Sequence, residues 1–371
     1  MKILFFSLEN LNNASGFDRL LLDGIANYPV SSDKITIFTS NYGIKRLDDS
    51  YIQNRLLGRA TYIKESVFKI GHVPLPTFNF IESLYLAFKN SDVIYYVFGF
   101  MFFDILVLAF KLILRKKIII SFHAPLILEN HFLHNVYLKT VLRMTLKYYD
   151  RIHTVNREDT AYFEGIGFKN KTFYIPNGIN MDGLLSISIE DKFIHDRLRF
   201  AFAGRFEKQK SIDLLIKVMP RLKNLKIEFY FAGSGSFQNE IIRSSQDFDF
   251  VKYLGFLNFD ELNRFYSQVD IFVAPSHQEP FGIVIIEALA SGLPVIASKT
   301  SGPLDLLEEG STGWFINAIN EDAIYDKIIE IYNRWLENKD YFKNMPSLCR
   351  ETAKKYSVEN MLVNMRHKLF S

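Results

Sequence analysis

The chain has 371 residues, 48% of them hydrophobic and 23% charged, which is enough apolar material for two domain cores and excludes general disorder. Cys349 is its only cysteine, so an internal disulfide and a Cys-rich zinc site are excluded, and the cytoplasm is the expected location. The net charge of +3 is too small to indicate nucleic acid binding. Residues 1–180 hold 21 Lys+Arg against 15 Asp+Glu, whereas residues 181–371 hold 23 against 26, an asymmetry that can mark one half as facing an anionic surface.

Short β-branched and aromatic runs alternate with helical stretches along the whole chain, a pattern typical of parallel sheets with helices on both faces. In the first half we expect strands near residues 3–7, 35–39, 93–98, 118–122, 152–155 and 173–175. In the second half we expect them near residues 200–203, 227–232, 251–254, 271–274, 295–297 and 314–316. The sequence therefore predicts an α/β protein of two doubly wound, Rossmann-like units, with a ligand cleft at the carboxyl ends of their strands.

Four segments need separate interpretation. Residues 41–76 have no regular period, and we expect a mobile loop there. Residues 93–114 are nearly long enough to span a bilayer, but Asp104 near their middle would be costly in lipid, so we expect a strand, a loop and a buried helix. Residues 180–197 are polar and are the best linker candidate. The amphipathic helix at about 356–371 can pack on either half, including back onto the first domain.

The most specific string of the sequence covers residues 274–297. It predicts a strand, a tight loop, a helix closed by Gly292 and another strand. Gly282 at the helix start would let backbone N–H groups approach an anion, and the helix dipole favours a phosphate there. Glu279 in the loop and Glu287 about a turn into the helix can point towards the same cleft, where carboxylates accept hydrogen bonds from sugar hydroxyls.

These two glutamates, with seven residues between them and Pro-Phe-Gly after the first, resemble the E-x7-E motif of retaining glycosyltransferases of the GT4 type, the glycosyl transferases group 1. The resemblance extends over essentially the whole chain and implies the GT-B fold. It implies an acceptor-binding domain at residues 1–180 and a donor-binding domain at residues 181–355. The resemblance also implies that Glu279 contacts the donor sugar and that Glu287 contacts the nucleotide ribose. The backbone that would lie against the sugar and diphosphate is that of Phe281, Gly282 and Ile283.

A second string resembles the family's Gly-Arg at a strand end, followed by a Lys five residues after the Arg. Here these residues are Gly204, Arg205 and Lys210. An Arg and a Lys that converge on a diphosphate neutralise the charge that grows on the leaving nucleotide. Ser211 stands where the family usually has Gly, and Lys208 could substitute for Lys210 if the loop is shifted.

Weaker matches complete the predicted site. Gly233 begins a Gly-x-Gly turn after a strand. Phe256 and Leu257 follow the strand beside which the nucleotide base would stack. Gly16 lies in a string that resembles the loop touching the donor phosphate and the acceptor, with the usual pair of glycines reduced to one. His123 follows a strand at a point where the family often carries a His near the donor sugar.

No metal and no cofactor beyond the donor substrate are expected. The triplet at residues 247–249 matches the Asp-x-Asp metal signature of the other major glycosyltransferase fold, but it lies far from any matching context. The basic and aromatic clusters at residues 111–117 and 143–149 could rest on an anionic membrane. Alternatively, their apolar residues belong to the core and their charges are merely solvated.

The resemblance thus implies a retaining glycosyltransferase of the hexosyltransferase type. It would move a sugar from a nucleotide diphosphate, with UDP favoured and GDP-mannose as the alternative, to a hydroxyl of a glycan, a lipid-linked sugar or a small molecule. The expected location is cytoplasmic, with peripheral contact at the inner face of the membrane as an open question. Two rivals stay open: a catalytically silent sugar-nucleotide-binding partner subunit, and a nucleotide-sugar epimerase on the same fold.

Overall fold

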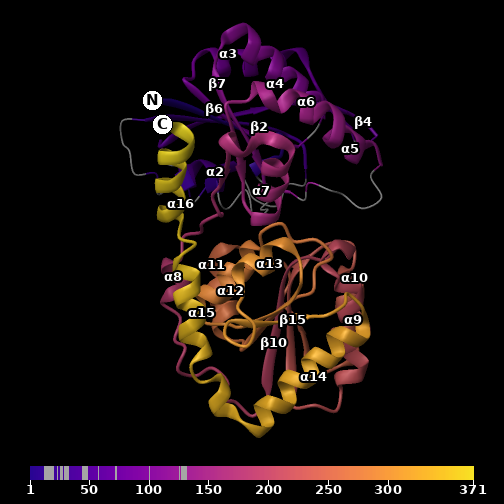
Figure 1. Cartoon of the computed structure of the whole chain (residues 1–371). Coiled ribbons are helices and arrows are strands. Elements are labelled where there is room, and N and C mark those ends of the chain that lie inside the picture. Colours follow the sequence, from indigo (N-terminus) through magenta and orange to yellow (C-terminus); the bar gives the residue numbers. More distant parts are fainter. Residues whose placement is uncertain are drawn as a thin grey trace. The chain divides into compact units, whose positions relative to one another are not determined.

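The computed structural model describes residues 1–11, 21–22, 24–25, 28, 33–43, 49–56, 58–71, 73–99, 101–124, 126 and 132–371. The chain divides into two compact units (Figure 1). One unit comprises Met1–Ile179 together with Val358–Ser371, and the other comprises Asn180–Ser357. The first unit is therefore built from two separate stretches of the chain.

The first unit is organised around a seven-stranded parallel sheet with the strand order β3-β2-β1-β6-β7-β8-β9. The six strands expected in this half are all present, because their apolar residues are buried on both faces of the sheet. The strands are β1 (Lys2–Phe6), β2 (Lys34–Ser40), β3 (Ala60–Glu65), β6 (Val93–Val97), β7 (Lys117–Phe122), β8 (Arg151–Thr154) and β9 (Thr172–Tyr174).

The prediction of a mobile loop at residues 41–76 was wrong for the described part of that segment. It contains the helix α2 (Asp49–Leu56), the edge strand β3 and the antiparallel hairpin of β4 (Val67–Ile70) and β5 (Val73–Pro76). Every residue of β3 is exposed or only half-buried. An edge strand needs no continuous apolar run and tolerates charge and proline, so its sequence lacks the period of a buried strand.

Helices complete the first unit. The expectation for residues 93–114 was confirmed, because β6 is followed by the helix α4 (Met101–Leu114). No helix among the described residues is both long enough and apolar enough to cross a membrane. The other α-helices in the described part of this unit are α3 (Phe78–Lys89), α5 (Phe132–Tyr137), α6 (Arg143–Thr145), α7 (Arg157–Phe163) and α16 (Val358–Met365). Single turns follow several of them, at Leu138–Leu142, Leu146–Tyr148, Glu164–Phe168, Lys169–Lys171 and Arg366–Phe370.

The last helix of the chain packs on the first unit. The guanidinium of Arg366 forms an ion pair with Asp33, with Nη1 and Oδ2 2.8 Å apart. The ring of Phe370 lies 6.2 Å from the ring of Phe5 in β1 and 6.3 Å from the ring of Tyr95 in β6. The final residues of the sequence thus cover strands formed near its beginning.

The second unit is built on a six-stranded parallel sheet with the order β12-β11-β10-β13-β14-β15. Its strands are β10 (Leu198–Arg205), β11 (Ile227–Ser234), β12 (Val251–Tyr253), β13 (Ile271–Ala274), β14 (Val295–Ser298) and β15 (Gly313–Ile316). Its helices are α8 (Asp182–Leu185), α9 (Ile212–Leu222), α10 (Gln238–Asp247), α11 (Phe259–Ser267), α12 (Ile283–Ala290), α13 (Ser301–Leu306), α14 (Glu321–Glu337) and α15 (Met345–Lys354), with short turns at Lys208–Lys210 and Lys339–Phe342. All six strands expected in this half are confirmed.

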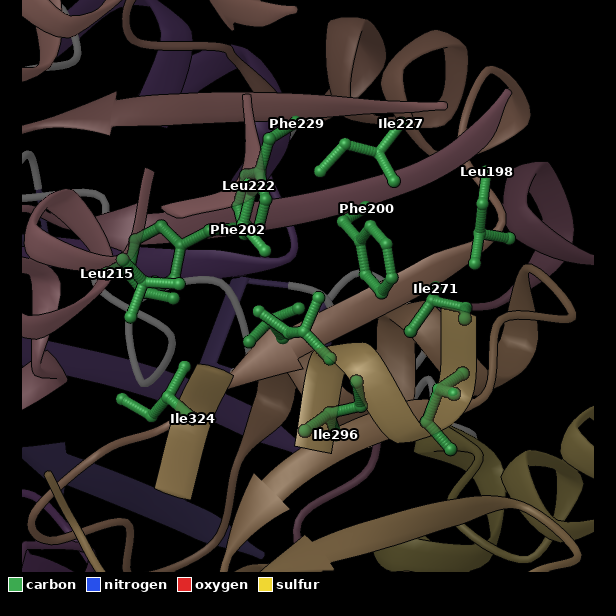
Figure 2. Packing of buried hydrophobic residues seen from close by; sticks show 14 of the residues in the cluster. Leu198, Phe200, Phe202, Leu215, Leu222, Ile227, Phe229, Ile271, Ile296 and Ile324 are labelled. Carbon is green, nitrogen blue, oxygen red and sulfur yellow. The ribbon is translucent and has the colours of Figure 1, made fainter. Parts of the chain in front are cut away.

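A hydrophobic core lies between this sheet and the helices α9 and α14 (Figure 2). Phe200 of β10 and Phe229 of β11 stack with ring centroids 6.0 Å apart. Leu215 and Leu222 of α9 and Ile324 of α14 pack into the same cluster, and all five side chains are fully buried. Burying a side chain of this size contributes about 1.5–3 kcal/mol, so the cluster makes β10 and β11 a rigid support.

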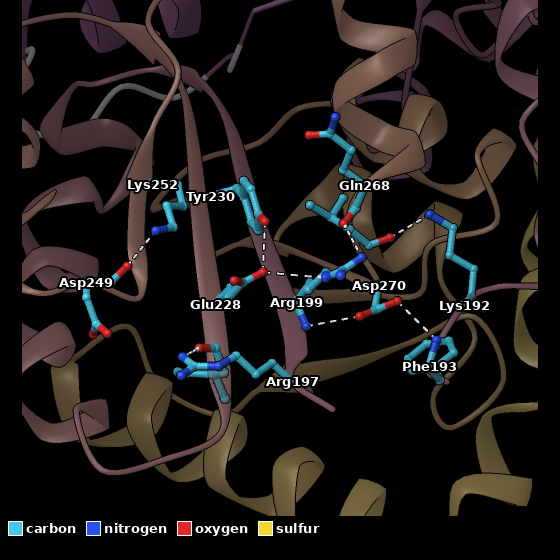
Figure 3. Close-up of polar contacts among 12 residues, drawn as sticks. Lys192, Phe193, Arg197, Arg199, Glu228, Tyr230, Asp249, Lys252, Gln268 and Asp270 are labelled. Carbon is cyan, nitrogen blue, oxygen red and sulfur yellow. Dashed lines mark hydrogen bonds and ion pairs between the residues drawn. The ribbon is translucent and has the colours of Figure 1, made fainter. Parts of the chain in front are cut away.

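The predicted linker at residues 180–197 belongs to the second unit and is partly buried in it (Figure 3). The ammonium of Lys192 donates to the carbonyls of Tyr266, Ser267 and Val269, at 2.9, 3.0 and 2.6 Å. The carboxylate of Asp270 accepts the backbone N–H of Phe193 and of Arg199, both at 3.0 Å. A polar sequence therefore does not mean a free linker here, because carbonyls at the end of α11 satisfy the buried charge.

Candidate functional site

The carboxyl ends of β10 and β11 bring two predicted glycines side by side. Gly204 and Gly233 are direct partners in the strand register. A Cβ atom added to Gly233 would collide with the carbonyl oxygen of Gly204, so glycine is required at this position. The N–H of Gly233 also donates to the carbonyl of Gly255, at 2.7 Å. Three chain segments thus converge at the edge of the sheet where parallel α/β folds bind ligands.

The loop after β10 carries the predicted cationic residues. Arg205 ends the strand and is exposed. Lys208–Lys210 form a single 3-10 turn, and Ser211 follows with φ 54° and ψ 32°, in the left-handed region. The family's usual glycine would adopt this backbone without strain, so the structure explains why glycine is common at this position. The N–H of His277 donates to the carbonyl of Gln209 at 2.9 Å and ties this loop to the one that contains Glu279.

Two of the predicted catalytic residues are in direct contact. The ammonium of Lys210 and the carboxylate of Glu279 form an ion pair at 2.5 Å, and their side chains are 20% and 10% exposed. They are 69 residues apart in sequence. An ammonium group has three N–H donors, so Lys210 can hold Glu279 and still donate to an anion. The structure therefore confirms that these residues meet, while their catalytic roles stay predictions.

The helix α12 begins beside this ion pair. Gly282 precedes it with φ 94° and ψ 60°, a left-handed conformation that turns the chain sharply into the helix. Phe281 is buried, and Ile283 is the first helical residue. The N–H of Gly302 donates to the carbonyl of Glu279 at 2.9 Å. A Cβ on Gly302 would collide with the Phe281 carbonyl, so the start of α13 packs directly against the turn into α12.

Glu287 lies deeper than Glu279. It is 2% exposed, and its Oε2 accepts a hydrogen bond from the hydroxyl of Tyr266 at 2.8 Å. Tyr266 is fully buried at the end of α11, where Lys192 binds its carbonyl. Sequence reasoning missed Tyr266, because a tyrosine near a helix end gives no sign that it reaches a carboxylate 21 residues further on.

Phe256 and Leu257 follow β12. Phe256 is 40% exposed, and Leu257 is half-buried. The strand exit is fixed by the N–H of Leu254, which donates to the Phe231 carbonyl at 2.9 Å. An exposed aromatic ring near Gly233 is a surface on which a nucleotide base can stack.

His123 belongs to the first unit, directly after β7. Its Nε2 lies 2.9 Å from the hydroxyl of Tyr95, and that hydroxyl lies 2.5 Å from Nδ1 of His153. Burial and the neighbouring His153 hold the pKa of His123 well below its usual range. Tyr95 and His153 were not predicted from the sequence. The predicted Gly16 lies outside the described residues.

The described residues contain no cluster of three or more His, Cys, Asp or Glu that could hold a metal ion. In the Asp-x-Asp triplet at residues 247–249, Asp247 is the last residue of the helix α10. The carbonyl of Asp249 accepts a hydrogen bond from the Lys252 ammonium at 2.7 Å.

Two family models match the chain, Glycosyltransferase Family 4 over residues 32–182 and Glycosyl transferases group 1 over residues 187–355. An uncharacterized glycosyltransferase of Methanocaldococcus jannaschii is 31% identical over 180 residues, covering 47% of this chain and 44% of that protein. The sulfoquinovosyl transferase of Arabidopsis thaliana is 30% identical over 171 residues, covering 45% of this chain and 32% of that protein. The chain spans about half or less of the length of these relatives.

Solved structures resemble the whole chain. Anabaena HepE in complex with UDP has a TM-score of 0.77 at 18% identity, with all of both chains covered. The sucrose-phosphate synthase of Thermosynechococcus elongatus has a TM-score of 0.72 at 19% identity, covering 99% of this chain and 97% of that one. At these identities the likeness shows the fold, which is GT-B with two Rossmann-like domains.

Proposed function

Because the chain belongs to the GT-B glycosyltransferases of the group 1 and family 4 type, we propose that it moves a sugar from a nucleotide diphosphate to an acceptor hydroxyl with retention of the anomeric configuration. The observation that carries this proposal is the Lys210–Glu279 ion pair beside the start of α12. A cation that can bind phosphate and a carboxylate that can bind sugar hydroxyls, side by side at one sheet edge, support this proposal.

In this proposal the second unit binds the donor. Lys210, Arg205 and the first N–H groups of α12 hold the diphosphate. Glu279 accepts hydrogen bonds from the sugar, Glu287 binds the ribose, and the base stacks on Phe256. UDP is the favoured nucleotide, because HepE, whose fold this chain shares, was solved with UDP and with UDP-glucose. GDP-mannose is the alternative.

The reaction needs no strong base and no metal. The bond between the anomeric carbon and the phosphate oxygen breaks, while Lys210 and Arg205 stabilise the negative charge that develops on the diphosphate. The acceptor hydroxyl attacks from the same face, and the departing phosphate oxygen takes its proton. We propose that the acceptor is bound mainly by the first unit, and that water is excluded from the bound donor during the reaction, which limits hydrolysis.

We also propose that the first unit makes peripheral contact with the anionic inner face of a membrane. Leu112 and Ile113 at the end of α4 are 60% and 67% exposed, and Met144 of α6 is 69% exposed. Arg143 and Lys147, on either side of Met144, are exposed as well. Exposed apolar side chains next to cations match an anionic lipid surface. The alternative that the apolar residues are core holds for Leu146 and Tyr149 of these clusters, which are buried, but not for the three exposed side chains.

Co-sedimentation with vesicles tests the membrane contact. Wild-type protein should bind vesicles containing anionic lipid and not purely zwitterionic ones. Replacing Met144 by Asp should abolish this binding, whereas replacing Leu142, which is 1% exposed, by Met serves as the control that leaves the surface unchanged. Equal binding by wild type and Met144→Asp would refute the contact.

A thermal-shift screen with UDP, GDP, ADP and their sugar conjugates tests the donor site. A ligand at 100 times its Kd stabilises the protein by about 2.7 kcal/mol, so one nucleotide should raise the Tm clearly more than the others. With that donor, NMR of the anomeric proton of the product reports retention or inversion. A silent subunit would bind the donor without turnover, and an epimerase would convert it without an acceptor, so the same experiment separates the rivals.

A further inference from the structure

Tyr356, near the end of the second unit, contacts the loop that contains Glu279 and also the helix packed against that loop. Its ring meets the ring of Phe281 nearly edge-on, with the centroids 6.1 Å apart and the planes at 69°, an arrangement that aromatic rings favour. Its hydroxyl donates to the carbonyl of Asp305 in α13 at 3.1 Å. Phe281 is buried, and Tyr356 is half-buried. One side chain thus connects the turn into α12 with the helix α13.

The hydroxyl of Tyr356 binds a carbonyl at the end of α13. This helix is only six residues long, and Asp305 is its fifth residue. The last carbonyls of a helix have no N–H partner within it. The carbonyl of Pro303 is bound by the N–H of Leu307, at 2.9 Å, and the carbonyl of Asp305 is bound by Tyr356. The tyrosine therefore helps to fix the end of a very short helix.

The start of the same helix holds the backbone of Glu279. The N–H of Gly302 donates to the carbonyl of Glu279 at 2.9 Å, and a Cβ atom on Gly302 would have no room beside the carbonyl of Phe281. Tyr356 thus fixes the loop directly through the ring of Phe281 and indirectly through α13. The carboxylate of Glu279, which pairs with Lys210, extends from the backbone that is held in this way.

We infer that Tyr356 is a positioning residue for the donor: it fixes the backbone of residues 279–282 and, through it, the carboxylate of Glu279 and the first N–H groups of α12. This inference rests on the proposed role of these groups in holding the sugar and the diphosphate. Such groups have to stay within about 0.5 Å of their productive positions. Loosening the loop should therefore slow transfer but leave binding of the nucleoside unchanged, because its proposed contacts, Phe256 and Glu287, lie outside the loop.

Tyr341 provides a matched control in the same unit. Its hydroxyl also donates to a carbonyl at 3.1 Å, that of Gly310, and its ring also lies edge-on to a phenylalanine, Phe342, with the centroids 5.1 Å apart. Like Tyr356, it is half-buried. Gly310 lies three residues before β15, at the amino end of that strand, whereas the candidate site lies at the carboxyl ends of the parallel strands. Tyr341→Phe and Tyr356→Phe therefore remove the same kind of hydrogen bond at different places.

Hydrogen–deuterium exchange of the full chain tests the inference without any ligand. In Tyr356→Phe, the backbone amides of α13 and of the start of α12, including that of Gly302, should exchange about fivefold faster, which corresponds to one hydrogen bond of about 1 kcal/mol. Tyr341→Phe should leave these amides unchanged. Unchanged exchange in Tyr356→Phe would overturn the inference. No donor and no turnover are needed, so this failure is distinguishable from failure of the proposed transferase activity, which the nucleotide screen tests separately.

Kinetics separate positioning from a merely structural role. Both variants should lower the Tm by similar amounts, because each loses one hydroxyl–carbonyl hydrogen bond. Only Tyr356→Phe should also lower kcat, by about fivefold, the factor expected for its amide exchange, with an unchanged Kd for uridine, the nucleoside of the favoured donor. The same kcat in Tyr356→Phe and Tyr341→Phe would refute the positioning role.

Discussion

Ser211 adopts a backbone conformation that suits glycine, and its replacement should stabilise the protein. Its φ of 54° and ψ of 32° lie in the left-handed region. The side chain is fully buried, and its Oγ has no hydrogen-bond partner among the described residues. Ser211→Gly would relieve the backbone and remove the hydroxyl, whereas Ser211→Ala removes the hydroxyl alone and keeps the Cβ atom.

The two variants separate the two contributions. A buried hydroxyl without a partner costs about 1 kcal/mol or more, so Ser211→Ala should raise the free energy of unfolding by about 1 kcal/mol. A left-handed conformation costs a residue with a Cβ atom roughly 1–2 kcal/mol, and the greater freedom of glycine in the unfolded chain offsets about 0.4–1 kcal/mol of that. Ser211→Gly should therefore be more stable than Ser211→Ala by about 0.5–1 kcal/mol.

Calorimetry and urea unfolding measure these differences. One kcal/mol shifts the Tm of a unit of this size by roughly 2–4 °C, so the ranking of glycine, alanine and serine should be visible in a single thermal scan. A glycine variant less stable than the alanine variant would refute the strain. Because Lys210 keeps its charge in both, the Kd for the nucleotide should stay within about twofold, the effect of roughly 0.5 kcal/mol.

Further predictions concern the site and one buried acid. Lys210→Ala should weaken binding of the nucleoside diphosphate about 10- to 100-fold, because a charged hydrogen bond of about 1.5–3 kcal/mol is lost. Calorimetric titrations should show nearly unchanged binding of the nucleoside. Equal losses of affinity for both ligands would argue against a phosphate role. Glu279→Gln should abolish measurable transfer while retaining the fold by circular dichroism, and full activity would remove Glu279 from the reaction. Tyr266→Phe should lower stability by about 1 kcal/mol and weaken nucleotide binding through the loss of its hydrogen bond to Glu287. Burial raises the pKa of Asp104 from 3.8 to about 7, so the folded state keeps a proton that the unfolded state loses, and stability from this group falls as the pH rises from about 4 to 7. Asp104→Asn should remove this contribution, and identical pH profiles of unfolding free energy for both proteins would refute it.

Local sequence patterns predicted the buried strands and the loop that contains Glu279, because these signals are short-range. The apolar run of β7 is buried on both faces, and the Glu279 loop is defined by adjacent Pro and Gly residues. The edge strand β3 was missed, since half-buried edge positions impose no pattern.

The contacts that orient the site residues were also missed. Tyr95 and His153 are 58 residues apart, and Tyr266 meets a carboxylate on another helix. Only the parallel order of the strands, and the approach of the end of α11 to Glu287 of α12, create such contacts. Neither residue type nor spacing in the sequence reveals a partner that the fold alone brings near.

The two-part construction of the first unit also sets an order of synthesis. Asn180–Ser357 form the second unit as one continuous stretch, so it can fold as soon as it leaves the ribosome. The first unit must wait for Val358–Ser371, because Arg366 and Phe370 supply contacts to Asp33, Phe5 and Tyr95. The packing around the strand that carries Tyr95 is therefore completed by residues that are translated after the whole second unit.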